Sequence, residues 1–150
     1  RRARAGVARP ERPVVGVGHT TVAMLLLALA GARAWLGPSR PLPLPVEPRL
    51  TRVALLAPTT GWFDAPGAWD SVTPPVLAWA GGADAMTPPL HCERVARALE
   101  GRVAVELRVT PEAGHFTFMD APPPGVPEPH PDRAAFLAAV ADEVGRFVSR

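Results

Sequence analysis

Three short apolar segments of this chain lack the alternation of a half-buried strand. They are VVGVG at residues 14–18, RVALLA at 52–57 and VLAWAGG at 76–82. Continuous apolar runs of this length are typical of strands that are buried on both faces of a parallel sheet. In a fourth segment, VAVELRV at 103–109, valine and leucine residues alternate with Ala104, Glu106 and Arg108. This strand is predicted to have one solvent-exposed face and to lie near an edge of the sheet.

Helical patterns fill the intervals between these strands. Thr87 is a predicted N-cap with Pro88 at the first helical position, and apolar residues then recur at helical spacing as far as a stop at Gly101. Asp132 is predicted to cap a last helix. The apolar stripe of that helix consists of Phe136, Val140, Val144, Phe147 and Val148. Residues 21–32 are apolar all round, so as a helix they are expected to be buried on every side. This order of elements indicates an open α/β sheet.

The composition agrees with one globular domain. The chain has 150 residues, of which 47% are hydrophobic, and this predicts a single domain, residues 1–150, with a real core. The net charge is only +2 and aromatic residues make up 6%, so a nucleic-acid partner is not expected. Cys92 is the single cysteine, which excludes an internal disulfide and a cysteine cluster for metal. We predict no metal and no cofactor.

Residues with nucleophilic or titratable side chains follow three of the predicted strands. Thr20 follows the first strand, Asp84 the third and His115 the fourth. In open α/β sheets, functional groups gather beyond the carboxyl ends of the strands. A hydroxyl becomes a useful nucleophile when a histidine takes its proton, and a carboxylate fixes the tautomer of that histidine. The order nucleophile, acid, histidine is that of the α/β-hydrolases.

Three longer segments extend this likeness to nearly the whole chain. GVGHTTVAMLLLALAGAR, PPVLAWAGGADAMTPP and EAGHFTFMDAPPPG resemble the second half of an α/β-hydrolase of the dienelactone-hydrolase-like type. The resemblance implies a partial α/β-hydrolase fold, a mostly parallel sheet of about four strands flanked by helices, matching the fifth to eighth strands of the family. It also implies hydrolysis of a small-molecule ester or related acyl compound. The implied site residues are Thr20, Asp84 and His115 as the triad, the backbone N–H of Thr21 as an oxyanion donor, and Trp62 and Phe63 as pocket lining.

The predicted nucleophile turn departs from the family pattern. Thr20 stands in the place of the family's serine, and Val22 in the place of the second glycine of G-x-S-x-G. The nucleophile of such a turn has a positive φ, which costs about 1 to 3 kcal/mol and more for a β-branched residue. We expect Val22 to open the turn. The alternative function is therefore that of a catalytically inactive pseudo-hydrolase, or a truncated remnant, with a binding role.

The start of the chain supports a further interpretation. No segment before residue 14 resembles the earlier strands of the family, so the resemblance implies that the chain corresponds to the carboxyl-terminal half of a domain. We therefore expect self-association through the open sheet edge at 14–18. Residues 1–34 also fit, loosely, a cleaved secretion signal. The strand at 14–18 favours the helix interpretation, and the apolar run is shorter than the about 20 residues that span a bilayer. We expect no membrane partner and favour a cytoplasmic protein over an exported one.

Overall fold

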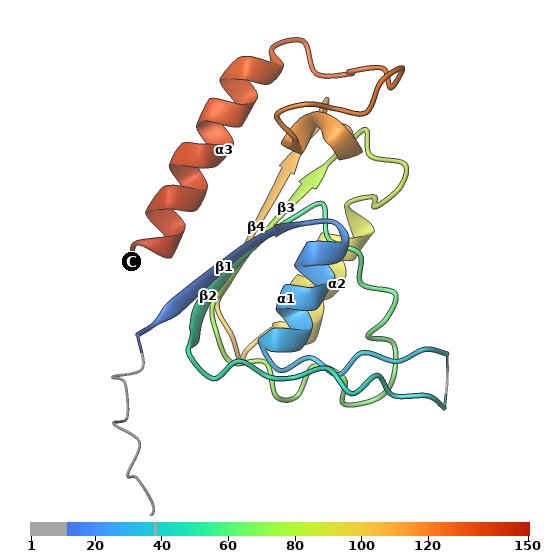
Figure 1. Ribbon diagram of the computed structural model, residues 1–150, viewed down its shortest axis with the longest axis vertical. Helices are drawn as coiled ribbons and strands as arrows, with labels where there is room; N and C mark the ends of the chain where they lie inside the picture. Colours follow the sequence, from blue (N-terminus) through green and yellow to red (C-terminus); the bar gives the residue numbers. More distant parts are fainter. Residues whose placement is uncertain (1–11, 38) are drawn as a thin grey trace, which may run out of the picture.

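The computed structural model describes residues 12–37 and 39–150, and its elements are arranged as one sheet with helices on both sides (Figure 1). In chain order the elements are β1 (Val14–His19), α1 (Thr21–Leu29), β2 (Leu50–Leu56), β3 (Val76–Gly81), α2 (Leu90–Leu99), β4 (Val105–Thr110), the 3₁₀ helix η1 (His115–Phe118) and α3 (Arg133–Val148). Residues 1–11, which carry the basic part of the predicted secretion signal, lie outside the described residues.

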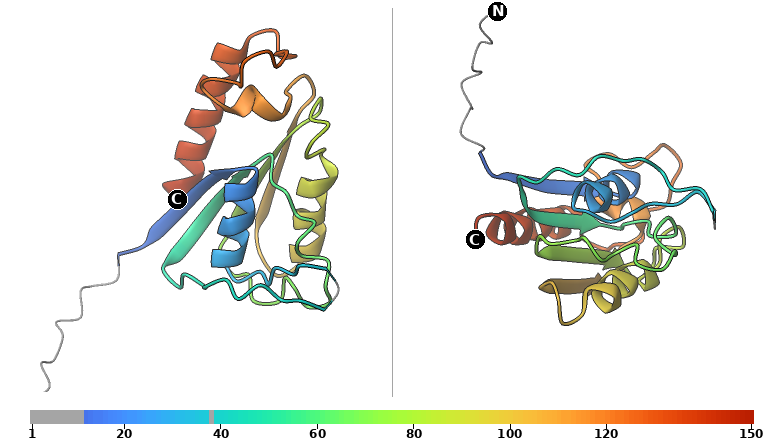
Figure 2. Two further views of the ribbon diagram at one scale, coloured as in Figure 1. Left: turned by 45° about the vertical axis from the view of Figure 1, so that its right-hand side comes forward. Right: turned by 90° about the horizontal axis from the view of Figure 1, so that it is seen from below.

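The four strands form a parallel sheet in the order β1-β2-β3-β4. Helices α1 and α2 cover one face of the sheet, and α3 covers the other (Figure 2). This arrangement confirms the predicted α/β class with four parallel strands. It also confirms the position of β4 at a sheet edge. Because the strands are parallel, their carboxyl ends all lie along the same edge of the layer.

Each face of the sheet has its own core. One core joins α1 and α2 to the sheet through apolar residues such as Leu27, Val53 and Val95. The other joins α3 to the sheet, and Phe136 and Phe147 of the predicted stripe are buried in it. The β3 strand lies between the two cores and is buried at every position. Asp132 caps α3 as predicted, because its Oδ1 accepts a hydrogen bond of 3.0 Å from the backbone N–H of Ala135.

The first strand and the first helix are less covered than their sequences predict. Gly16 and Gly18 face α1 so closely that a Cβ added at either would lie within 3 Å of Leu26. The alternate residues Val15 and Val17 face the side of α3, and they are 43% and 49% exposed. The prediction that β1 is buried on both faces was therefore wrong. The prediction of complete burial for residues 21–32 was also wrong, because α1 packs on the sheet with one side only and exposes residues such as Leu25.

The carboxyl end of β3 packs directly against the segment that follows β4. A Cβ added to Gly81 would lie 2.2 Å from the carbonyl oxygen of Ala113, and one added to Gly82 would lie 2.6 Å from that of Pro111. The backbone N–H of Ala83 donates to the carbonyl of Ala113 at 3.0 Å. Two adjacent glycines thus allow the loops after β3 and β4 to pack backbone against backbone.

Within the part of the chain that the structure describes, no helix combines the length and the apolar character needed to cross a membrane.

The close approach at Gly81 gives a stability prediction. We expect Gly81→Ala to lower the free energy of unfolding by about 2 kcal/mol or more, because the new methyl group meets backbone that cannot move independently. The matched control is Gly145→Ala in α3, where the added Cβ meets nothing within 4 Å. That change should be neutral or stabilising by up to about 1 kcal/mol. Chemical denaturation followed by circular dichroism measures both, and equal values for the two variants would contradict the close approach.

The exposed face of β1 gives a second prediction. Among the described residues, no strand pairs with the outer edge of β1, so self-association through this edge stays our expectation. Sedimentation velocity over a range of concentrations should show dimers or larger species. The double variant Val15→Lys, Val17→Lys should remain monomeric, whereas Leu107→Lys, Val109→Lys on the exposed face of β4 should associate as the unchanged chain does. A chain that stays monomeric at all concentrations contradicts this expectation.

Candidate active site

Thr20 forms the whole connection between β1 and α1. The strand ends at His19 and the helix begins at Thr21, so the chain reverses within one residue. Thr20 has φ 48° and ψ −110°, a conformation that L-residues rarely adopt and that costs about 1 to 3 kcal/mol. Its backbone N–H donates to the carbonyl of Leu56 at 3.0 Å, which fastens the turn to β2. The structure thus has the strained strand-to-helix turn on which hydrolases carry a nucleophile.

Val22 does not open this turn, and the expectation that it would was wrong. The side chain of Val22 points outward and is 53% exposed. The close contact occurs instead at Gly18, where an added Cβ would lie 2.9 Å from Cγ1 of Val22. In this chain Gly18, before the turn, therefore provides the space. In the family pattern a glycine after the turn provides it.

Two polar groups at the turn have no partner in the described part of the chain. The side chain of Thr20 caps no backbone group of α1 and makes no other hydrogen bond there. The backbone N–H of Thr21, the first residue of α1, has no helical partner because helices leave their first N–H groups unpaired. A hydroxyl and an N–H donor that no described residue binds thus lie on adjacent residues; their roles as nucleophile and oxyanion donor stay predictions.

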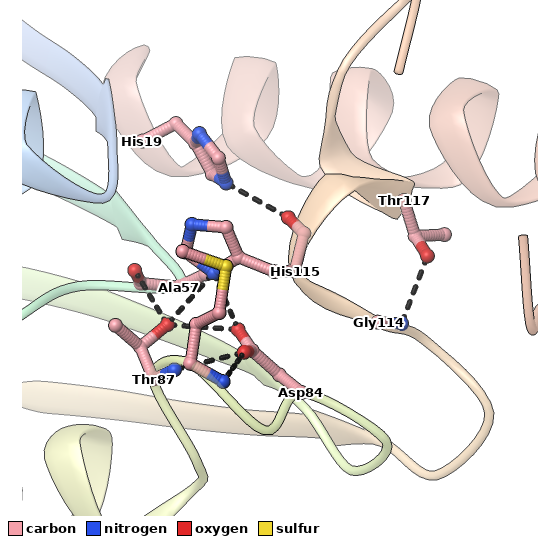
Figure 3. A network of polar contacts seen from close by, with 8 residues as sticks. His19, Ala57, Asp84, Thr87, Gly114, His115 and Thr117 are labelled. Atoms are coloured by element: carbon pink, nitrogen blue, oxygen red, sulfur yellow. Dashed lines mark hydrogen bonds and ion pairs between the residues drawn. The ribbon is translucent and has the colours of Figure 1, made fainter. Parts of the chain in front are cut away.

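Asp84 and His115 meet at the carboxyl ends of β3 and β4. Nδ1 of His115 donates to Oδ2 of Asp84 at 2.8 Å, and the two residues are only 3% and 6% exposed (Figure 3). His115 is the first residue of η1, which begins after the close approach at Gly81. The structure brings together the carboxylate and the imidazole that the sequence predicted as acid and base.

The carboxylate of Asp84 is surrounded by donors. Its Oδ1 accepts hydrogen bonds of 2.8 Å from the backbone N–H groups of Met86 and Thr87. Burial by itself would raise the pKa of Asp84, but the backbone N–H of Thr87, the His115 ring and the Thr87 hydroxyl together lower it. Asp84 is therefore ionised at neutral pH, the state in which a carboxylate stabilises an imidazolium.

His19 contacts His115, a role that its sequence position did not reveal. Nε2 of His19 donates to the backbone carbonyl of His115 at 2.9 Å, and the two ring centroids are 4.7 Å apart (Figure 3). Burial lowers the pKa of His19, although the hydrogen bond to the His115 carbonyl opposes this shift. Because His19 directly precedes Thr20, this contact places the nucleophile turn beside the histidine.

Thr87 is not the N-cap that the sequence predicted. Helix α2 begins three residues later, at Leu90, with Pro89 in the N-cap position. The Thr87 hydroxyl lies instead 2.8 Å from Oδ2 of Asp84, 3.0 Å from Nδ1 of His115 and 3.1 Å from the carbonyl oxygen of Ala57. The cap prediction failed because the hydroxyl bonds across three segments of the chain.

Trp62 and Phe63, the predicted pocket residues, lie apart from these groups. Phe63 is 2% exposed and belongs to the core, where it packs against Trp69. Trp62 lines a pocket of about 390 Å³ together with Trp35 and Asp64, and neither Asp84 nor His115 borders it. The structure therefore does not bring the two aromatic residues to the acid and base.

Other described side chains that could bind a metal or act as a nucleophile are buried or hydrogen-bonded away from the acid and base. Burial raises the pKa of the Cys92 thiol to about 12, with the nearby charge of Asp84 adding to the shift, so this thiol stays protonated. Nδ1 of His91 accepts a hydrogen bond of 3.1 Å from the backbone N–H of Thr60. Among residues 12–37 and 39–150, no three histidine, cysteine or carboxylate side chains gather as a metal site requires.

Comparison with known proteins places this arrangement in a fold. No family model and no curated protein matches the chain. Esterase PE8 superposes with a TM-score of 0.55 at 16% identity, over 89% of this chain and 49% of that one. The esterase Est2 from the Planctomycetes species Thermogutta terrifontis superposes with a TM-score of 0.52 at 17% identity, over 87% and 53%. The chain thus spans about half the length of these structures, and over that span it has an α/β-hydrolase-type fold.

Proposed function

We propose that this chain takes part in the hydrolysis of a small-molecule ester or related acyl compound. The observation that carries the proposal is the strained turn at Thr20, whose hydroxyl has no partner among the described residues, at the sheet edge where Asp84 and His115 pair. Strained backbone is retained where the surroundings over-determine it, and such residues cluster at active sites. The dienelactone-hydrolase-like type, and a match to the fifth to eighth strands of such a domain, belong to this proposal.

The proposed reaction uses these groups in two steps. In the first, the Thr20 oxygen attacks the acyl carbon, Nε2 of His115 takes the hydroxyl proton, and the ester bond breaks as the histidine returns that proton to the leaving alcohol. In the second, His115 takes a proton from water, the water oxygen attacks the acyl group, and the bond to Thr20 breaks. Thr20 regains its proton from the histidine, so the chain ends unchanged.

Electrostatics supports both steps. The oxyanion that forms at the acyl carbon would accept a hydrogen bond from the backbone N–H of Thr21, which α1 leaves unpaired. The developing positive charge on His115 would be stabilised by ionised Asp84 at 2.8 Å. No cofactor enters this scheme. A role for Trp62 in binding the substrate stays a prediction, since its pocket lies apart from the acid and base.

Substitutions at the triad positions test the proposal. With p-nitrophenyl acetate, we expect the unchanged chain to hydrolyse the ester above background and His115→Ala to reduce the rate to background. Thr20→Ser should raise the rate by up to about tenfold, equivalent to about 1.4 kcal/mol, because the β-branched side chain crowds the strained turn. Thr21→Ser is the matched control, because it makes the same change at the next residue and keeps the backbone N–H.

The outcomes separate the proposed function from its alternative. Equal rates for the unchanged chain and His115→Ala would remove the catalytic role. Activity that appears only with Thr20→Ser would show that the unchanged chain is inactive although the rest of its site is competent. That outcome corresponds to the pseudo-hydrolase with a binding role. Val22→Gly should change little in either case, because the Val22 side chain is 53% exposed and Gly18 already leaves room for it.

The lowered pKa of Asp84 predicts a dependence of stability on pH. A carboxylate whose pKa is lower in the folded than in the unfolded chain stabilises the fold above its unfolded pKa, near 3.8. That stabilisation is lost as the pH falls through the folded pKa. We expect Asp84→Asn to lower the free energy of unfolding by about 2 kcal/mol at pH 7, and less as the pH falls below about 4.

Urea denaturation at several pH values measures this difference. The control is Asp142→Asn, the same substitution at an exposed position of α3. It should leave the stability nearly unchanged at each pH. A gap between Asp84→Asn and the unchanged chain that widens towards low pH would contradict an ionised Asp84.

A further inference from the structure

The hydroxyl of Thr87 joins three separate segments beside the acid and base. It lies 2.8 Å from Oδ2 of Asp84 and 3.0 Å from Nδ1 of His115. It also lies 3.1 Å from the carbonyl oxygen of Ala57, at the end of β2 (Figure 3). Thr87 is only 5% exposed, so water does not compete for these contacts.

Counting protons fixes the direction of the hydrogen bonds. The carbonyl oxygen of Ala57 and the ionised Oδ2 of Asp84 can only accept, and the Thr87 hydroxyl has one proton to give. If Thr87 gave that proton to Nδ1 of His115, Nδ1 and Oδ2 would face each other at 2.8 Å with no proton between them. The ring nitrogen must therefore carry the proton, and the Thr87 oxygen accepts from it together with Oδ2.

The backbone at Ala57 directs its carbonyl toward this hydroxyl. Ala57 has φ 45°, one of two non-glycine residues with positive φ among those described, and Thr20 is the other. Its N–H donates to the carbonyl of Trp79 at 2.8 Å while its own carbonyl accepts from Thr87. Thr20 thus follows the carboxyl end of β1 and Ala57 that of β2, and the Ala57 carbonyl contacts the Thr87 hydroxyl.

The two oxygens of Asp84 are held by one neighbour. The backbone N–H of Thr87 donates to Oδ1 and its hydroxyl lies against Oδ2, each at 2.8 Å. The carboxylate therefore cannot rotate without breaking a bond to Thr87. A valine at position 87 would have the same shape and keep the first bond, but it would lose every contact that the hydroxyl makes.

We propose that Thr87 is a positioning residue, whose hydroxyl holds the Asp84 carboxylate and keeps His115 in the single tautomer with the proton on Nδ1. The free lone pair is then on Nε2, the nitrogen that must take the proton of Thr20. The catalytic consequence rests on the proposed hydrolase function, whereas the tautomer of His115 does not.

The kinetic test uses three variants of buried threonines and p-nitrophenyl acetate. Thr87→Val should lower kcat by about 10- to 100-fold and leave KM within about twofold, because substrate binding does not involve the hydroxyl. Thr87→Ser, which restores the hydroxyl, should return kcat to within about threefold of the unchanged chain. Thr60→Val is the control, because Thr60 is equally buried and its hydroxyl bonds to His91 instead. A normal kcat for Thr87→Val would overturn the inference.

A spectroscopic test needs no activity. In nitrogen-15 spectra recorded at a pH where the ring is neutral, His115 of the unchanged chain and of Thr87→Ser should show a protonated Nδ1 and an unprotonated Nε2. In Thr87→Val the two ring nitrogens should shift toward the values of a tautomer mixture. Thr87→Ala serves as a second variant if the valine destabilises the fold. Identical nitrogen shifts in all variants would overturn the inference.

The two tests separate this inference from the proposed function. An inactive chain in which Thr87→Val alters the His115 tautomer contradicts the proposed hydrolysis and supports the positioning role. An active chain that is indifferent to Thr87→Val supports hydrolysis and contradicts the positioning role.

Discussion

The buried contact between Asp84 and His115 is the constraint on which the functional edge of this sheet depends. A carboxylate that is 3% exposed is costly unless donors surround it, and here two backbone N–H groups, a hydroxyl and an imidazole do so. The contact also requires the loops after β3 and β4 to approach closely. Glycine at positions 81 and 82 permits that approach, because a side chain at either would meet the backbone of the facing loop.

Much of this arrangement could be predicted from the sequence, because it follows from local pattern and from chain direction. The apolar runs and the one alternating segment predicted four parallel strands with the last at an edge, and the structure has them in that order. Parallel strands place their carboxyl ends together, so Asp84 and His115 were expected to meet, and they do. The cap at Asp132 was likewise predicted, since it depends only on its own first helical turn.

The features that the sequence did not predict depend on what lies across space. The exposure of Val15 and Val17 depends on whether α3 reaches β1, which no local pattern reports. Thr87 has the pattern of an N-cap, yet its hydroxyl bonds to groups 30 and 28 residues away in the chain. Val22 was expected to open the nucleophile turn, but its side chain is half exposed and lies over a glycine of β1. The close contact with the Val22 side chain occurs at Gly18, on the strand side of the turn.

The Thr20 hydroxyl lies at a strained turn and has no hydrogen-bond partner among the described residues. A threonine that merely replaced a nucleophile at no functional cost would be expected to bond its hydroxyl locally, as threonine does at helix starts. Here Thr20 precedes α1 without capping it, and no group in the described residues bonds to its hydroxyl. Its backbone is nevertheless held at φ 48° by the bond to Leu56 and by α1. The fold therefore bears the strain of the turn and leaves the hydroxyl without a hydrogen-bond partner among the described residues.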